Sequence, residues 1–134
     1  MRTLIIILFS VLIFNCTGKS EPITNQEKLV AISEEILENL VAGKYEKIAE
    51  HFDQKMKESL SPDQLKAVYE GLKANVGEFK EKGEVLTENY DMNNQKFRIV
   101  YIIMKFEKAP FKLQVVFDED DLVAGLFLKP VTAK

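Results

Sequence analysis

The sequence predicts an α+β fold in which helices come first in the chain and an antiparallel sheet follows. Between residues 27 and 76, apolar residues recur at intervals of three and four, which is the period of amphipathic helices. From residue 84 onward they recur at every second position, and short clusters of Asn, Asp and Pro separate the runs, as in strands joined by tight turns. This order of elements predicts helices packed on one face of a curved sheet.

The first residues of the chain predict export. The single charge of Arg2 precedes an apolar run of eleven residues at positions 4–14, which is the layout of a secretory signal peptide. A membrane-spanning helix needs about 20 apolar residues, so this run is too short to cross a bilayer. The chain then reaches Cys16, its only cysteine, and an internal disulfide is therefore excluded.

Residues 12–16 resemble a bacterial lipobox, in which the cysteine is lipidated on sulfur and becomes the new N-terminus. The sequence departs from the usual pattern at Ile13, where Leu is preferred, and at Asn15, where a small residue is preferred. Two or more acyl chains hold a protein firmly at a membrane. Lipidation of Cys16 therefore predicts an exported protein anchored to the bacterial cell membrane or to the outer membrane. The alternative is a soluble exported protein.

The predicted organisation has three parts. Residues 1–15 are a lipoprotein signal peptide, residues 16–26 are the lipidated cysteine with a flexible linker, and residues 27–134 are a single α+β domain. The chain carries 18 basic and 21 acidic side chains, a net charge of −3. This mild acidic balance argues against nucleic acid as a partner.

The first helix is predicted over residues 27–41, and Gly43 supplies the left-handed conformation that ends a helix. A second short helix is expected to carry Tyr45, Ile48, Ala49 and Phe52 on its inner side, and Met56 and Leu60 are expected in a looser segment. The apolar stripe of the first helix consists of Leu29, Ile32, Ile36, Leu37, Leu40 and Val41.

A strong helix start lies at residues 61–64. Ser61 is a helix-capping residue, Pro62 suits the first helical position, and Gln64 is placed to complete a capping box. This helix is expected to end near Gly77. The side chains expected to point inward are Leu65, Val68, Tyr69, Leu72 and Val76.

Four strands are predicted after this helix. They cover residues 84–90, 97–106, 111–117 and 122–128, and the acidic turn DEDD at residues 118–121 separates the last two. The second strand is apolar on both faces. One face carries Phe97, Ile99, Tyr101 and Ile103, and the other carries Val100, Ile102, Met104 and Phe106.

Only one of these faces packs on the helices, and the other needs a cover. The protein's own chain, a second subunit in a homodimer, and an apolar small molecule or a protein partner all remain open as that cover.

Several short motifs carry a family resemblance. Over about residues 27–131 the chain resembles a bacterial family with a domain of unknown function, in which a helix start, a Gly-x-Phe and a closing strand pair recur. The matching residues here are Phe52, Met56, Leu60, Ser61, Pro62, Gln64, Leu65, Gly77, Phe79, Phe117, Asp118, Gly125, Leu126 and Phe127.

That family is similar to the nuclear transport factor 2-like, or SnoaL-like, superfamily. The resemblance implies a cystatin-like cone, with three helices against a strongly bent sheet, often with a cavity and often dimeric. In longer relatives the domain precedes an α/β-hydrolase, whereas this sequence contains no Gly-x-Ser-x-Gly motif, the turn that carries the nucleophile of such enzymes. Kinship of fold does not decide between enzymes and binding proteins.

The candidates for chemistry are few. His51 is the only histidine and precedes Asp53 by two residues. Residues two apart on a helix do not face each other, so His51 is expected to be a surface or half-buried structural residue. The acidic turn lacks the spacing of a calcium loop and is expected to be solvated. We predict no catalytic residue, no metal site and no cofactor.

The four tyrosines have two possible places. They are expected in the core, or alternatively around a ligand pocket. They are Tyr45, Tyr69, Tyr90 and Tyr101.

The sequence therefore predicts a membrane-anchored, non-catalytic lipoprotein of the bacterial cell envelope that holds an apolar ligand or a protein partner. The alternatives are a small cone-fold enzyme that uses proton transfer, and a purely structural dimeric lipoprotein. The side chains expected to line a cavity or an interface are Tyr45, Phe52, Tyr69, Phe97, Tyr101, Met104 and Phe106.

Overall fold

The computed structural model describes residues 25–132, so the predicted signal peptide and Cys16 lie outside the described residues. The helices are α1 (Asn25–Ala42), α2 (Tyr45–Ala49), α3 (Gln54–Ser59) and α4 (Pro62–Val76). The strands are β1 (Phe79–Met92), β2 (Gln95–Phe106), β3 (Pro110–Phe117) and β4 (Val123–Pro130). The predicted α+β class, with helices before an antiparallel sheet, is confirmed.

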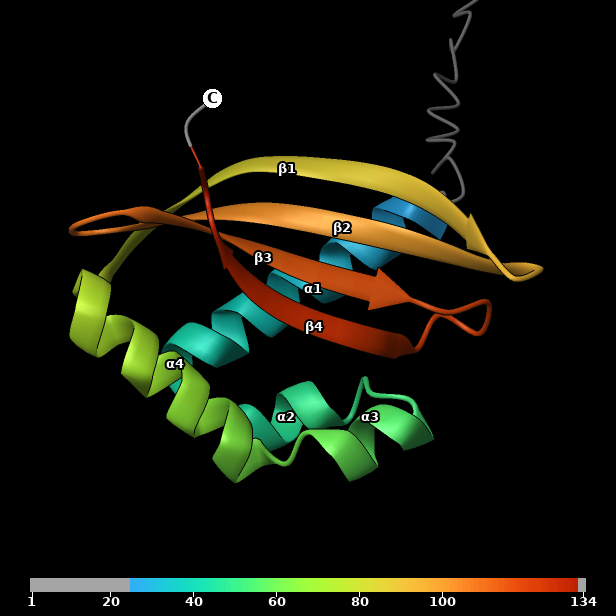
Figure 1. Cartoon of the computed structure of the whole chain (residues 1–134), viewed down its shortest axis with the longest axis horizontal. Coiled ribbons are helices and arrows are strands. Elements are labelled where there is room, and N and C mark those ends of the chain that lie inside the picture. Colours follow the sequence, from blue (N-terminus) through green and yellow to red (C-terminus); the bar gives the residue numbers. More distant parts are fainter. Residues whose placement is uncertain (1–24, 133–134) are drawn as a thin grey trace, which may run out of the picture.

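The strands form one open sheet in the order β1, β2, β3, β4, with every pair antiparallel. Figure 1 shows that the sheet is curved and that α1 to α4 lie on one side of it. The turn between β1 and β2 uses Asn93 and Asn94, whose φ angles are 51° and 63°. Asn tolerates this left-handed conformation, as the sequence suggested.

The helix boundaries follow the capping residues. Gly43 has a φ of 76° directly after α1. At the start of α4, the backbone N–H of Gln64 donates to Ser61 Oγ over 3.2 Å, and the backbone N–H of Ser61 donates to Gln64 Oε1 over 2.8 Å. The predicted capping box is therefore present.

Two predicted segments differ from the structure. The segment after α2 is not loose, because Asp53 Oδ1 accepts the backbone N–H of Met56 over 2.7 Å and caps α3. The first strand begins at Phe79 rather than at residue 84. Its register against β2 shifts between Lys82 and Val85, and such bulges break the alternation by which a strand is recognised.

Two residues predicted to face inward are exposed. Val41 is 40% exposed and Val68 is 54% exposed. At 100° per residue, Val68 lies about 80° from the centre of the buried apolar stripe of α4, and Val41 lies about 100° from that of α1. In both cases the buried stripe is narrower than the apolar pattern of the sequence.

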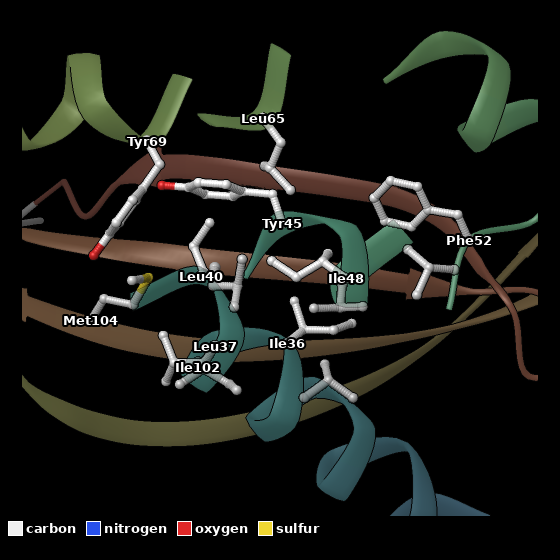
Figure 2. Close-up of a cluster of buried hydrophobic side chains, with 14 of the residues drawn as sticks. Ile36, Leu37, Leu40, Tyr45, Ile48, Phe52, Leu65, Tyr69, Ile102 and Met104 are labelled. Atoms are coloured by element: carbon white, nitrogen blue, oxygen red, sulfur yellow. The ribbon is translucent and has the colours of Figure 1, made fainter. Parts of the chain in front are cut away.

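The core lies between the helices and the inner face of the sheet. In Figure 2 side chains from α1, α2 and α4 meet those of β2, with Ile36, Leu40 and Ile48 in contact with the layer that contains Ile102 and Met104. These five residues have no exposed surface. The turn after α2 is tied to the sheet by backbone hydrogen bonds to Val123 of β4, at 2.8 and 2.9 Å.

Candidate interaction surface on the sheet

The face of the sheet that points away from the helices, here called the outer face, carries a row of side chains across all four strands. The register pairs Leu86 with Tyr101, Tyr101 with Gln114, and Gln114 with Phe127. These four residues are called the central row. Leu86 and Phe127 stand at its two ends and are 48% and 46% exposed.

The adjacent row is more tightly packed. It consists of Glu88, Ile99, Val116 and Gly125, paired in that order, and is called the second row. Ile99 is only 7% exposed. A Cβ atom at position 125 would lie 3.0 Å from a ring carbon of Phe127, so the glycine leaves room for that ring. The outer face is thus shaped by side-chain packing even though no described helix covers it.

Polar contacts hold the aromatic side chains of the central row. The Tyr101 O–H donates to Glu88 Oε2 over 2.8 Å, and Lys112 Nζ lies 4.8 Å from the centre of the Tyr101 ring. Burial, followed by the hydrogen bond to Glu88 and its charge, raises the pKa of Tyr101. The phenol therefore stays protonated and remains a donor at neutral pH.

Charges divide the outer face into two halves. Acidic side chains, Glu81 and Glu88, lie on β1, whereas Lys112 and Lys129 lie on β3 and β4. Lys129 Nζ lies 5.2 Å from the centre of the Phe127 ring. Glu81 is paired with Lys105 of β2 over 3.1 Å. The Lys105 charge offsets part of the negative charge of this half, which stays acidic.

The residues predicted for a cavity or an interface are separated into two groups. Phe97 and Tyr101 are half-buried on the outer face. The others lie in the core between helices and sheet, where the Phe106 ring packs 6.4 Å from Tyr69 and 5.9 Å from Phe79. The members of the core group are Tyr45, Phe52, Tyr69, Met104 and Phe106.

The two tyrosines of the core are both buried, at 7% exposure for Tyr45 and 2% for Tyr69. The Tyr45 O–H is 3.5 Å from a carboxylate oxygen of Glu70, and burial, with the Glu70 charge next in size, raises its pKa. Burial raises the pKa of Tyr69 to about 12, with smaller contributions from Tyr45 and nearby glutamates. Both phenols are therefore neutral in the physiological range.

His51 and Asp53 have different partners. The sequence suggested that His51 lies inside a helical segment. The helix α2 ends at Ala49, however, so His51 lies in the turn that follows it. Its Nε2 is 3.5 Å from Glu35 Oε1, and its side chain is 24% exposed. It is half-buried, as expected, while Asp53 caps α3.

The acidic turn between β3 and β4 is held by its own hydrogen bonds. Asp118 Oδ1 accepts two backbone N–H groups of the turn. Asp121 receives Arg98 Nη2 over 2.5 Å and Lys28 Nζ over 3.0 Å. Burial acts to raise the pKa of Asp121, but the hydrogen bonds and charges of Lys28 and Arg98 outweigh it and lower that pKa. This network joins α1, β2 and the turn at one end of the molecule.

An open pocket of about 430 Å³ lies beside this network, lined by Asn89, Asp91, Lys96, Phe97, Arg98 and Glu119. Its lining mixes both charges. Within residues 25–132, no three His, Cys, Asp or Glu side chains are grouped closely enough to bind a metal ion. Of the helices in the same range, none is long and apolar enough to span a membrane.

The sequence predicted the apolar outer face of β2, but not the residues of β1 and β4 that extend this face. Leu86 and Phe127 were assigned to strands without a role, since their common row depends on a register that the sequence does not show. The signal that was available is the alternation within each strand, which places Leu86 and Tyr90 on one face of β1.

Comparison with known proteins supports the fold. The chain is similar to a protein from Ruminococcus gnavus ATCC 29149 with an NMR structure, at 23% sequence identity and a TM-score of 0.62, over 77% of this chain and 90% of that one. No curated protein matches the chain. The model of a family described as "protein of unknown function (DUF3887)" matches residues 33–126, from within α1 to within β4, and the chain therefore belongs to this family.

Proposed function

We propose that this chain is a lipid-anchored, non-catalytic interaction domain of the bacterial cell envelope, and that it binds a protein partner through the outer face of its sheet. The observation that carries the proposal is the central row, which exposes Leu86 and Phe127 on a hydrogen-bonded sheet. Further exposed apolar side chains on the same face of β1 are Tyr90 and Met92.

The shape of this face favours a protein over a small molecule. Ligand sites for small molecules are concave and enclose most of the ligand, whereas these side chains stand across a sheet of four strands. Contiguous exposed apolar surface marks protein or membrane contacts. Each Å² of apolar surface removed from water contributes roughly 25 cal/mol, so covering this face favours association.

The hydrogen-bonded polar groups support action by contact. Asp53 caps a helix, Asp121 binds Lys28 and Arg98, and the Tyr101 hydroxyl binds Glu88. Groups engaged in this way stabilise the fold and are not placed as an acid and a base around one reacting atom.

We further infer that the domain is a nuclear transport factor 2-like cone. Helices packed on one side of a curved antiparallel sheet support this assignment. The lipid anchor at Cys16 is supported by the lipobox-like sequence alone. The intact mass of the protein extracted from native membranes tests it, since lipidation predicts a chain that begins at Cys16 and carries acyl chains, and an unprocessed chain would contradict it.

A photo-crosslinking residue tests the interaction surface. Benzoylphenylalanine at position 127 in the full chain, irradiated in native membranes, is expected to give a protein adduct. The matched control at Val68, which is 54% exposed on α4, is expected to give none. If positions 86 and 127 both give no protein adduct, the proposed function is wrong.

A further inference from the structure

We propose that one end of the sheet rests on the membrane that holds the lipid anchor. This end, here called the hairpin end, carries the turn between β1 and β2 and the turn between β3 and β4. The occupant that we assign to it is a surface of zwitterionic phospholipid. The inference rests on the anchor in the proposed function, and it adds a second contact to the protein contact proposed for the central row.

The chain enters the domain at the hairpin end. Figure 1 shows that α1 begins at the same end of the molecule as both turns. Gln26 Nε2 donates to Thr87 Oγ1 of β1 over 2.6 Å, and Lys28 Nζ lies 3.0 Å from Asp121 Oδ2 in the second turn. These contacts fix the start of α1 beside both turns, so the segment that leads back to Cys16 joins the domain there.

The length of that segment favours the hairpin end over the opposite one. Residues 16–24 precede α1, and nine residues reach at most about 30 Å. At a rise of about 3.3 Å per residue, Met92 lies about 17 Å from Thr87 along β1, and Phe79 lies about 26 Å from it in the other direction. The hairpin end therefore reaches the anchored surface with length to spare, whereas the opposite end would need an almost fully extended segment.

The hairpin end exposes apolar side chains. Tyr90 and Met92 of β1 are 48% and 47% exposed, and Leu122 of the second turn is 39% exposed. The half-buried Phe97 is paired with Tyr90 across the strands. Tyrosine is enriched where hydrocarbon meets water in membranes. These side chains are few, but a tether keeps them at a high local concentration beside the membrane, so a weak contact is sufficient.

The polar groups of the first turn keep the contact shallow. Asn93 and Asn94 form its tip, with φ angles of 51° and 63°, and Asp91 faces Lys96 just behind it. Amides and charges lose their hydration in hydrocarbon at a high cost in free energy. The hairpin end is therefore expected to lie among the lipid headgroups and not in the hydrocarbon.

The charges select the type of headgroup. The open pocket beside the turns is lined by acidic side chains, Asp91 and Glu119, and by basic ones, Lys96 and Arg98. A zwitterionic headgroup carries an ammonium or a quaternary amine and a phosphate, which match these two kinds of charge. Anionic lipids would face the carboxylates of residues 118–121, and like charges repel. Phosphatidylethanolamine and phosphatidylcholine are therefore favoured over phosphatidylglycerol.

A fluorescent label on the full lipidated chain tests the contact. Gln95 is exposed and is paired with Met92. Gln95→Cys, labelled with a nitrobenzoxadiazole maleimide in phosphatidylcholine vesicles, is expected to emit at shorter wavelength and to be quenched by a spin label near the lipid headgroups. Lys108→Cys at the opposite end of the sheet and Lys66→Cys on α4, both exposed, are expected to emit as in water. Cys16 takes no label when its sulfur is lipidated.

A charge substitution separates the apolar contact from proximity alone. Tyr90→Glu with Met92→Glu is expected to abolish the wavelength shift of the label at position 95, because charged side chains stay in water. Val68→Glu, exposed on α4, is expected to leave it unchanged. Circular dichroism checks that each chain is folded. Replacing most of the phosphatidylcholine by phosphatidylglycerol is expected to reduce the shift. A folded double variant that keeps the full shift would contradict the inference.

The outcomes distinguish this inference from the proposed function. If the label at position 95 emits as in water while Cys16 is lipidated and position 127 crosslinks to a protein, the membrane contact is wrong and the proposed function stands. If the label is shielded in native membranes but not in protein-free vesicles, a protein covers the hairpin end and the lipid surface is wrong. If Cys16 of the unmodified chain takes the label, the anchor and this inference both fail.

Discussion

Asp121 shows how one residue joins distant parts of the chain. It has a φ of 62° in the turn between β3 and β4, and its carboxylate binds Lys28 of α1 and Arg98 of β2. The sequence placed it in a solvated acidic turn, since nothing in the local pattern indicates two basic partners from other elements. The network appears only once the sheet and the helix are packed together.

The lowered pKa of Asp121 predicts a dependence of stability on pH. A carboxyl group whose pKa is lower in the folded state than in the unfolded state, where it is about 3.9, stabilises the fold above that value. This stabilisation is lost as the pH falls through the folded pKa. Asp121→Asn is therefore expected to lower the free energy of unfolding at pH 7 and to reduce its loss between about pH 5 and pH 2.

Urea unfolding over that pH range measures both effects. Lys28→Gln removes only one of the two partners and is expected to give an intermediate result. An Asp121→Asn chain with the same pH dependence as the unmodified chain would show that the ion pairs contribute nothing to stability.

At the scale of elements, α4 was predicted well because its start depends on local chemistry. Ser61, Pro62 and Gln64 are adjacent in sequence, and the capping box needs no contact with the rest of the fold. The short α3 was not predicted, although Asp53 caps it. The start of β1 was also missed, since a bulge interrupts its pattern.

The capping box of α4 is expected to contribute to stability. Ser61→Ala removes the acceptor of the Gln64 N–H, and loss of such a cap costs about 1 kcal/mol of the free energy of unfolding. Ser61→Asp keeps an acceptor and is expected to retain most of that stability. Chemical denaturation measures both variants, and equal losses for Ala and Asp would contradict a capping role.

At the scale of the whole molecule, the two faces of the sheet differ in how they are covered. The inner face is covered by helices and holds the fold together, while the outer face keeps half-exposed side chains at both ends of its central row. A sheet with helices on one side alone buries one face only. Stability and binding are therefore expected to respond to different residues.

This division predicts that a truncation in the core lowers stability, whereas a truncation on the outer face lowers binding. Ile48→Ala, at a fully buried position of α2, is expected to cost about 2–5 kcal/mol of the free energy of unfolding. Phe127→Ala, at a position 46% exposed, is expected to change the stability of a dilute chain by less than about 1 kcal/mol and to reduce crosslinking at the outer face. A Phe127→Ala chain that unfolds as readily as Ile48→Ala would show that the outer face belongs to the core.

The sequence by itself determined the order of the layers, the C-terminal end of α1, both ends of α4, and the turn at Asn93 and Asn94, because periodicity, caps and positive φ angles depend on neighbouring residues. Only the tertiary structure decided that Leu86 and Phe127 share one row, and that Phe97 and Tyr101 lie apart from the core aromatics. The physical reason is that register is set by bulges, turns and packing across the whole sheet. A pattern within one strand shows which residues share a face, but not which residues of other strands lie beside them.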